Sequence, residues 1–144
     1  MSRNPKRGSA RWAGVPIFII ESERYIQLKP LSHSLLYELA AQYNGYNNGY
    51  LSLTRNDLAI RGFSSTRSNQ RAIDALVDAC IITRTRQGGI AKGKGGKRTC
   101  NLYAVNWRPI DEKTDDPLDN GFSFKGGFQA WFTDASKKVA LLSR

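Results

Sequence analysis

An α+β domain, in which short helices pack against a small antiparallel β-hairpin, is the fold class that the sequence predicts. Two helical patterns, residues 55–60 and 64–80, are joined by a short turn that contains Gly62. Two segments with the alternation typical of strands follow at residues 81–85 and 99–107, with a glycine-rich loop between them. Helices that lead directly into a hairpin indicate a single mixed domain.

Size and charge narrow the class of protein. The chain has 144 residues, of which 40% are hydrophobic, and this is enough for one domain with a core. It carries 22 Lys and Arg against 12 Asp and Glu, a net charge of +10. Residues 1–110 hold 17 of the basic and 6 of the acidic side chains, so the excess positive charge lies there. Such a field suits nucleic acid, and it would also suit an anionic membrane or a ribosome.

Composition divides the chain into four regions. Residues 1–14 are predicted as a flexible basic arm, 15–110 as the folded domain, 111–124 as an acidic linker and 125–144 as an amphipathic helix. The arm is expected either to contact DNA phosphates or the minor groove, or only to solubilise the terminus. Its basic residues are Arg3, Lys6, Arg7 and Arg11.

The domain begins with an apolar run at residues 15–20, expected as an edge strand or as an anchor segment packed on the domain. Residues 21–27 are expected to form a helical turn or two. A longer helix is predicted to follow, with Ser32 as its N-cap. Residues 50–53 are predicted as a short strand after an Asn- and Gly-rich turn. The core side of the longer helix is predicted to hold Leu35, Leu36 and Leu39.

Capping residues mark the start of the next two helices. Thr54 is predicted to cap residues 55–60, with Asp57 as a capping-box partner. Either Ser64 or Ser65 is predicted to cap the second helix, and the sequence does not choose between them. The short turn between the two helices completes a helix-turn-helix pattern.

The second of these helices, residues 64–80, is predicted to have two different faces. Its apolar side is formed by Ile73, Leu76, Val77 and Cys80. Its outward side is formed, at helical spacing, by Arg67, Gln70, Arg71 and Asp74. Arg and Gln are the side chains best shaped to read guanine and adenine edges, although an isolated helix with this pattern is more often merely solvated.

The loop between the two predicted strands is rich in glycine and positive charge. No acidic residue occurs from Ala79 to Ile110, a span that includes the whole loop. This composition favours contact with phosphates. A nucleotide-binding loop is disfavoured, because such a loop needs a following helix and a Lys followed by Ser or Thr. Its cations and those beside it are Arg86, Lys92, Lys94, Lys97 and Arg98.

Other classes of protein are disfavoured by what the sequence lacks. His33 is the one histidine, and Cys80 and Cys100 have no ligand-like spacing, so no zinc site is expected. The two cysteines are expected to be small buried hydrophobes in a reducing compartment. No nucleophile and base can be paired, so neither an enzyme nor a cofactor is expected. The longest apolar run, residues 15–20, is too short to span a bilayer and lacks a cleavage site, which favours the cytoplasm and the nucleoid.

The order of these elements resembles the winged-helix class, a three-helix core with a small antiparallel β-wing. Residues 43–86, from YNGYNNGYLSLTRNDLAIRGF onward, resemble the helix-turn-helix proteins of bacterial phages, prophages and integrative elements. The resemblance covers residues 15–110 and departs from the family at 79–82, where no glycine ends the helix. It implies a recognition helix that contacts DNA through Ser65, Thr66, Arg67, Asn69, Gln70 and Arg71, and a wing formed by the loop cations.

Sequence-specific binding of double-stranded DNA is therefore the expected function, as a transcriptional regulator of a phage or mobile element. Arg67 and Arg71 are expected to contact guanine, and Asn69 and Gln70 adenine, while Asp74 marks the end of the contact. The alternatives are a replication or recombination accessory protein at an origin or attachment site, and a winged helix that binds protein or RNA.

The predicted C-terminal helix has its own alternatives. It either folds back onto the domain or docks on a second copy or another protein. Its expected anchors are Phe128, Trp131 and Phe132. No membrane partner is expected.

Overall fold

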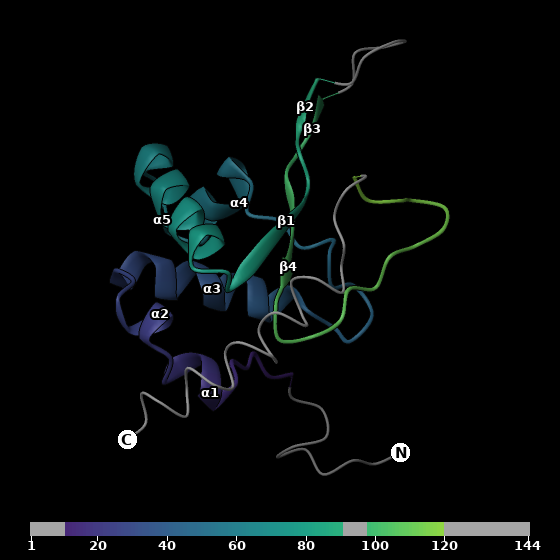
Figure 1. Ribbon diagram of the computed structural model, residues 1–144. Helices are drawn as coiled ribbons and strands as arrows, with labels where there is room; N and C mark the ends of the chain where they lie inside the picture. The colour runs from purple at the N-terminus through teal and green to yellow at the C-terminus, as the bar shows by residue number, and fades with distance from the viewer. Residues whose placement is uncertain (1–10, 91–97, 120–144) are drawn as a thin grey trace, which may run out of the picture.

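The computed structural model describes residues 11–90 and 98–119, and this part of the chain forms an α+β fold (Figure 1). The helices are α1 (Ile17–Ile20), α2 (Glu23–Ile26), α3 (Pro30–Gln42), α4 (Arg55–Ile60) and α5 (Thr66–Asp78). The strands are β1 (Ile82–Arg86), β2 (Gly89–Ile90), β3 (Arg98–Thr99) and β4 (Leu102–Val105). The predicted mixture of helices and one hairpin is confirmed.

The apolar run near the start of the domain is a helix, so its expectation as an edge strand was wrong. In α1 the Ile19 and Ile20 amides donate to the Pro16 carbonyl, at 3.0 and 3.2 Å. Ile19 is fully buried while Ile17 is 66% exposed, and the segment therefore anchors the domain through one face. The helical turn expected next is confirmed as α2.

Helix α3 begins two residues before the predicted cap. Pro30 occupies its first turn, where the missing amide hydrogen costs nothing, and Lys29 takes the cap position. Ser32 lies inside the helix, and its buried hydroxyl donates to the Ala72 carbonyl of α5 at 3.0 Å. Ser32 therefore ties two helices together instead of capping one. The core side of α3 is confirmed, because Leu35, Leu36 and Leu39 are all fully buried.

Both caps of the helix pair are hydrogen-bonded. Thr54 Oγ1 accepts from the Asp57 amide at 3.1 Å, as predicted. At α5 the cap is Ser65 and not Ser64, and Ser65 Oγ accepts from the Ser68 amide at 3.3 Å. The turn between the helices depends on Gly62, whose φ of +99° lies in the region that favours glycine.

Helix α5 ends in the same way, with a cysteine in the glycine position. Cys80 has a φ of +60°, its amide donates to the Val77 carbonyl at 2.9 Å, and the Ile81 amide donates to the Leu76 carbonyl at 3.1 Å. These two bonds form a Schellman motif. Its backbone turns the Cys80 side chain outward, so Cys80 is exposed, and Cys100 is exposed as well. The expectation that both cysteines are buried was wrong.

The hairpin contains two antiparallel pairs, β1 with β4 and β2 with β3. The register of β1 and β4 shifts between Arg84 and Arg86, which leaves Thr85 as a bulge. At this bulge the Thr85 hydroxyl donates a hydrogen bond to the Gly49 carbonyl at 2.6 Å. The strand predicted at residues 50–53 is reduced to one bridge between Leu51 and Tyr103. Strands β2 and β3 continue the hairpin beyond β1 and β4 (Figure 1).

Both faces of β4 are buried, whereas the alternating pattern in the sequence is typical of a strand with one buried face. Every residue from 102 to 107 is buried. In Figure 1 the helices lie on one side of the β1–β4 pair and residues 108–119 on the other. We call residues 111–119 the C-terminal strap.

The C-terminal strap packs on the domain, so its expectation as a linker was wrong, while residues 120–124 lie outside the described part. The Asp111 carboxylate accepts from the Asn48 amide at 2.9 Å, and the Asp111 amide donates to the Asn48 carbonyl at 2.8 Å. Leu118 is 6% exposed. Its contact requires Gly49, where a Cβ would lie 2.9 Å from Ile110 Cγ2 and 3.1 Å from Leu118 Cδ1. One leucine among carboxylates forms no apolar pattern, which is why the sequence did not reveal this contact.

Candidate nucleic-acid interface

Helix α5 is held to the domain by one face. Ala72, Ile73 and Leu76 are buried in the core, at 7, 3 and 0% exposure. The hydrogen bond from Ser32 to the Ala72 carbonyl fixes α5 against α3. The buried face fixes the rotation of the helix about its own axis and so decides which side chains face outward.

The opposite face of α5 carries the predicted polar residues. Arg67, Gln70, Arg71 and Asp74 are all exposed. Neither Arg67 nor Arg71 forms an ion pair within residues 11–90 and 98–119. The structure therefore brings two exposed cations and an exposed amide together over little more than one turn of one helix.

Asn69 does not belong to this face, and its expectation as an adenine-reading residue was wrong. It is 6% exposed, and its Nδ2 donates to the Phe63 carbonyl at 3.0 Å. This bond joins the first turns of α5 to the loop that follows α4. Asn69 precedes Ala72 and Ile73 by three and four residues, so helical spacing places it on the core side. That spacing was present in the sequence.

Ser65 and Thr66, at the start of α5, differ in whether their side chains are already hydrogen-bonded within the helix. The Ser65 hydroxyl is committed to the cap, since it accepts from the Ser68 amide and donates to Ser68 Oγ at 3.0 Å. Thr66 is exposed in the first helical turn. Ser65 is also exposed, but its main role in the structure is to start the helix.

Asp74 links the exposed face of α5 to the hairpin. Its Oδ1 accepts a hydrogen bond from Gln70 Nε2 at 3.0 Å and lies 3.4 Å from Arg84 Nη2 of β1. Arg84 stands opposite Tyr103 in the sheet, and its guanidinium carbon lies 5.7 Å from the Tyr103 ring centre. The sequence placed Asp74 on this face but did not reveal its partner on β1, because cross-element pairing has no local signal.

Two hollows flank α5, and each has a basic residue that the sequence interpretation missed. One of about 230 Å³ lies between Gln70 and the start of β4 and includes Arg55 and Cys100. Another of about 470 Å³ lies beside Arg71 and includes Lys29. Lys29 and Arg55 are single cations at helix starts, and nothing in their local pattern indicates that they lie near α5.

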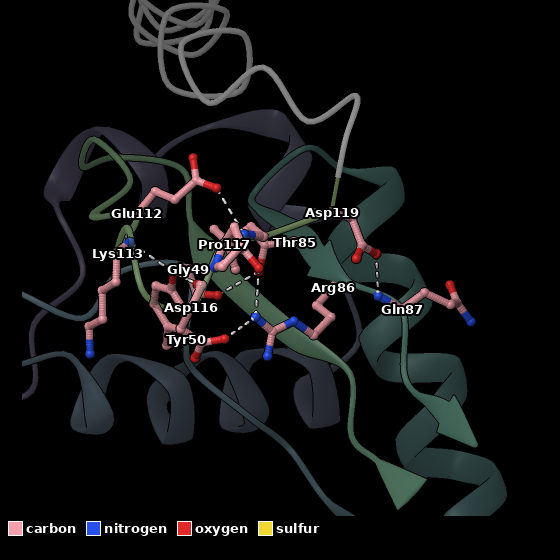
Figure 2. Close-up of polar contacts among 11 residues, drawn as sticks. Gly49, Tyr50, Thr85, Arg86, Gln87, Glu112, Lys113, Asp116, Pro117 and Asp119 are labelled. Atoms are coloured by element: carbon pink, nitrogen blue, oxygen red, sulfur yellow. Dashed lines mark hydrogen bonds and ion pairs between the residues drawn. The ribbon is translucent and has the colours of Figure 1, made fainter. Parts of the chain in front are cut away.

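Arg86, one of the predicted DNA-contacting cations of the hairpin, is bound by other residues of the chain. Arg86 Nη2 donates to Asp116 Oδ1 at 2.6 Å and to the Pro117 carbonyl at 2.8 Å, and its side chain is 23% exposed. Figure 2 shows Asp116 and Pro117 turned toward Arg86 at the end of β1, and Asp119 of the strap beside the next residue, Gln87, whose amide donates to Asp119 Oδ2 at 2.8 Å. The guanidinium of Arg86, one of the predicted DNA contacts, is therefore already bound by the strap in this structure.

The other predicted contacts fall largely outside the described residues. Arg98 begins β3, but its side chain is not described, and Arg11 is exposed. The predicted contacts that lie wholly outside are Arg3, Lys6, Arg7, Lys92, Lys94, Lys97, Phe128, Trp131 and Phe132.

Two arginines away from the α5 face are held by specific partners. A hydrogen bond to Glu38, at 2.9 Å, raises the pKa of Arg61 above its usual value. A hydrogen bond to the Tyr43 hydroxyl, at 3.0 Å, raises the pKa of Arg108. Both side chains therefore remain positively charged at any physiological pH.

Comparison of the chain with protein-family models, with curated proteins and with solved structures finds no match. Among residues 11–90 and 98–119, no cluster of His, Cys, Asp and Glu is arranged to hold a metal ion. In the same part of the chain, no helix combines the length and the apolar character needed to cross a membrane.

Proposed function

We propose that the domain is a winged helix that binds double-stranded DNA sequence-specifically, with α5 in the major groove and the β2–β3 end of the hairpin on the backbone. The protein would then act as a transcriptional regulator of a phage or mobile element. The observation that carries this proposal is the outward face of α5, where Arg67, Gln70 and Arg71 are exposed on a helix whose other face is buried.

The dimensions of α5 support the proposal. A helix of 13 residues is about 20 Å long and about 10 to 12 Å wide, and the major groove is about 12 Å wide. Arg67 and Arg71 would donate to guanine O6 and N7, and Gln70 would pair with adenine. Each bidentate contact contributes about 1 to 3 kcal/mol of discrimination between bases, so three of them would define a site.

The charge outside α5 supports the proposal in a different way. The net charge of +10 and the acid-free span from Ala79 to Ile110 favour phosphate contacts that carry no sequence information. Lys92, Lys94 and Lys97, which lie in the sequence between β2 and β3, would supply these contacts, together with Lys29 and Arg55 from the two sides of α5. Affinity from such contacts falls steeply as salt is raised.

Selection of duplexes from a random library, followed by titration on the selected and a scrambled duplex, tests the proposal. Arg71→Ala should lose the preference for the selected duplex. Lys94→Ala should weaken both duplexes equally and reduce the salt slope by about 1. If Arg67, Gln70 and Arg71 can all become alanine with the preference intact, α5 does not read DNA.

The genomic position of bound sites tests the regulatory part separately. Sites at promoters support a regulator, whereas sites in origin-like repeats or attachment sites support a replication or recombination accessory protein. If the protein occupies no discrete DNA sites at physiological salt, both the regulatory and the accessory role are contradicted. Binding of RNA or protein by the same domain then remains as the alternative.

A further inference from the structure

A row of three side chains joins the outward face of α5 to strand β1. Gln70 Nε2 and Arg84 Nη2 both approach Asp74 Oδ1, at 3.0 and 3.4 Å. The Arg84 end of the row is the better anchored, since its side chain is 26% exposed against 55% for Asp74 and lies against the Tyr103 ring. The carboxylate is thus placed between an amide on the exposed face and a cation on the sheet.

This carboxylate determines which way the Gln70 amide faces. An ionised carboxylate only accepts hydrogen bonds, so the amide turns its donor, Nε2, toward Asp74. The reversed amide would bring Oε1 against a negatively charged oxygen. A primary amide has two N–H groups and one carbonyl, so Oε1 and one N–H of Gln70 remain for another partner.

We propose that Asp74, held by Arg84, is a positioning residue that presets Gln70 to prefer adenine over guanine. This inference rests on the proposed function, in which α5 lies in the major groove. Adenine presents an acceptor, N7, beside a donor, the N6 amine, whereas guanine presents two acceptors, N7 and O6. An amide that is free to reverse can turn its donors toward guanine. An amide fixed by Asp74 keeps one donor and one acceptor in a single order, which matches adenine.

Asp74 also has a second, opposite effect on binding. A carboxylate on the DNA-facing side repels phosphates and lowers the affinity for every sequence. Removal of this carboxylate therefore raises general affinity while it lowers the preference for adenine at one base pair. A purely electrostatic role would produce the first effect alone, so the two roles can be separated by measurement.

The experiment uses the full chain and the duplex selected by the wild-type protein. Gln70→Ala first identifies the base pair whose preference depends on Gln70. Affinities for duplexes with adenine or guanine at that position are then compared for the wild type, Asp74→Ala and Asp74→Glu. The combined variant Gln70→Ala with Asp74→Ala completes the cycle.

We expect Asp74→Ala to reduce the adenine-over-guanine ratio about fivefold or more, the lower end of what one bidentate contact discriminates. Its affinity for an unrelated duplex should rise. Asp74→Glu keeps an acceptor-only carboxylate and should keep most of the ratio. The combined variant should lose no more than Gln70→Ala alone, because Asp74 acts through Gln70.

Three results would overturn the inference, and each has a different meaning. An unchanged adenine-over-guanine ratio in Asp74→Ala, with only a uniform gain in affinity, reduces Asp74 to an electrostatic role. A preference that depends on Arg71 but nowhere on Gln70 leaves the proposed function intact and removes the role of both Gln70 and Asp74. A wild-type protein that selects no duplex overturns the proposed function itself.

Discussion

The guanidinium of Arg86 and the carboxylate of Asp116, 30 residues apart in the chain, lie 2.6 Å from each other. The contact joins strand β1 to the C-terminal strap (Figure 2). A partly exposed ion pair of this kind contributes less than about 1 kcal/mol to stability. The main effect of the ion pair is on the position of the Arg86 side chain. The guanidinium, at the base of the hairpin, points toward Asp116 and not toward solvent.

Leu118→Ala should lower the free energy of unfolding by about 2 to 3 kcal/mol, because it removes a buried side chain by which the strap packs against the domain at Gly49. Urea denaturation measures the change. Ile60→Ala is the matched control, since Ile60 is 83% exposed, and it should change stability by less than about 0.5 kcal/mol. Equal, small effects of both substitutions would show that the strap does not pack.

Arg86→Ala should leave the preference for the selected duplex unchanged, because its guanidinium is already bound by Asp116 and the Pro117 carbonyl. Titrations over a range of salt should give a slope within about 0.5 of the wild type, whereas Arg71→Ala should lose the preference. An equal loss of affinity for both duplexes in Arg86→Ala, with the salt slope reduced by about 1, would place this residue back in contact with the DNA backbone.

Asn69→Ala should lower the free energy of unfolding by about 1 to 3 kcal/mol, because it leaves the partly buried Phe63 carbonyl without its hydrogen-bond donor. DNA preference, measured below the unfolding transition, should persist. The adjacent substitution Gln70→Ala should behave in the opposite way, with stability nearly unchanged and the preference for one base pair lost. A base-specific loss in Asn69→Ala would contradict its assignment to the core side.

Cys80→Gly should raise the free energy of unfolding by about 1 kcal/mol, since glycine adopts a positive φ without the steric cost that a side chain has there. Cys80 is exposed, so the substitution removes no core packing. Gly62→Ala provides the reverse test at the equivalent position of α4 and should be destabilising by a similar amount. A loss of stability in Cys80→Gly would mean that its thiol makes a stabilising contact.

Local patterns in the sequence were sufficient for several elements. Thr54 and the α4 helix, the core leucines of α3 and the two long strands all depend on neighbours within a few residues, and the structure confirms each. The outward position of Arg67, Gln70 and Arg71 also follows from helical spacing alone. The same spacing contained the correct position of Asn69, which the resemblance to recognition helices had obscured.

The tertiary structure decided the features that depend on residues far apart in the chain. Ser32 looked like a cap because Ser is a common cap, but Pro30 starts the helix earlier and frees the hydroxyl to bind α5. Arg86 looked like a free cation, and only the returning strap shows that Asp116 neutralises it. The sequence by itself determined a basic α+β domain with an exposed Arg and Gln face, because these properties come from composition and local periodicity. Which of its polar groups remain available was decided by long-range hydrogen bonds, because their partners have no fixed spacing along the chain.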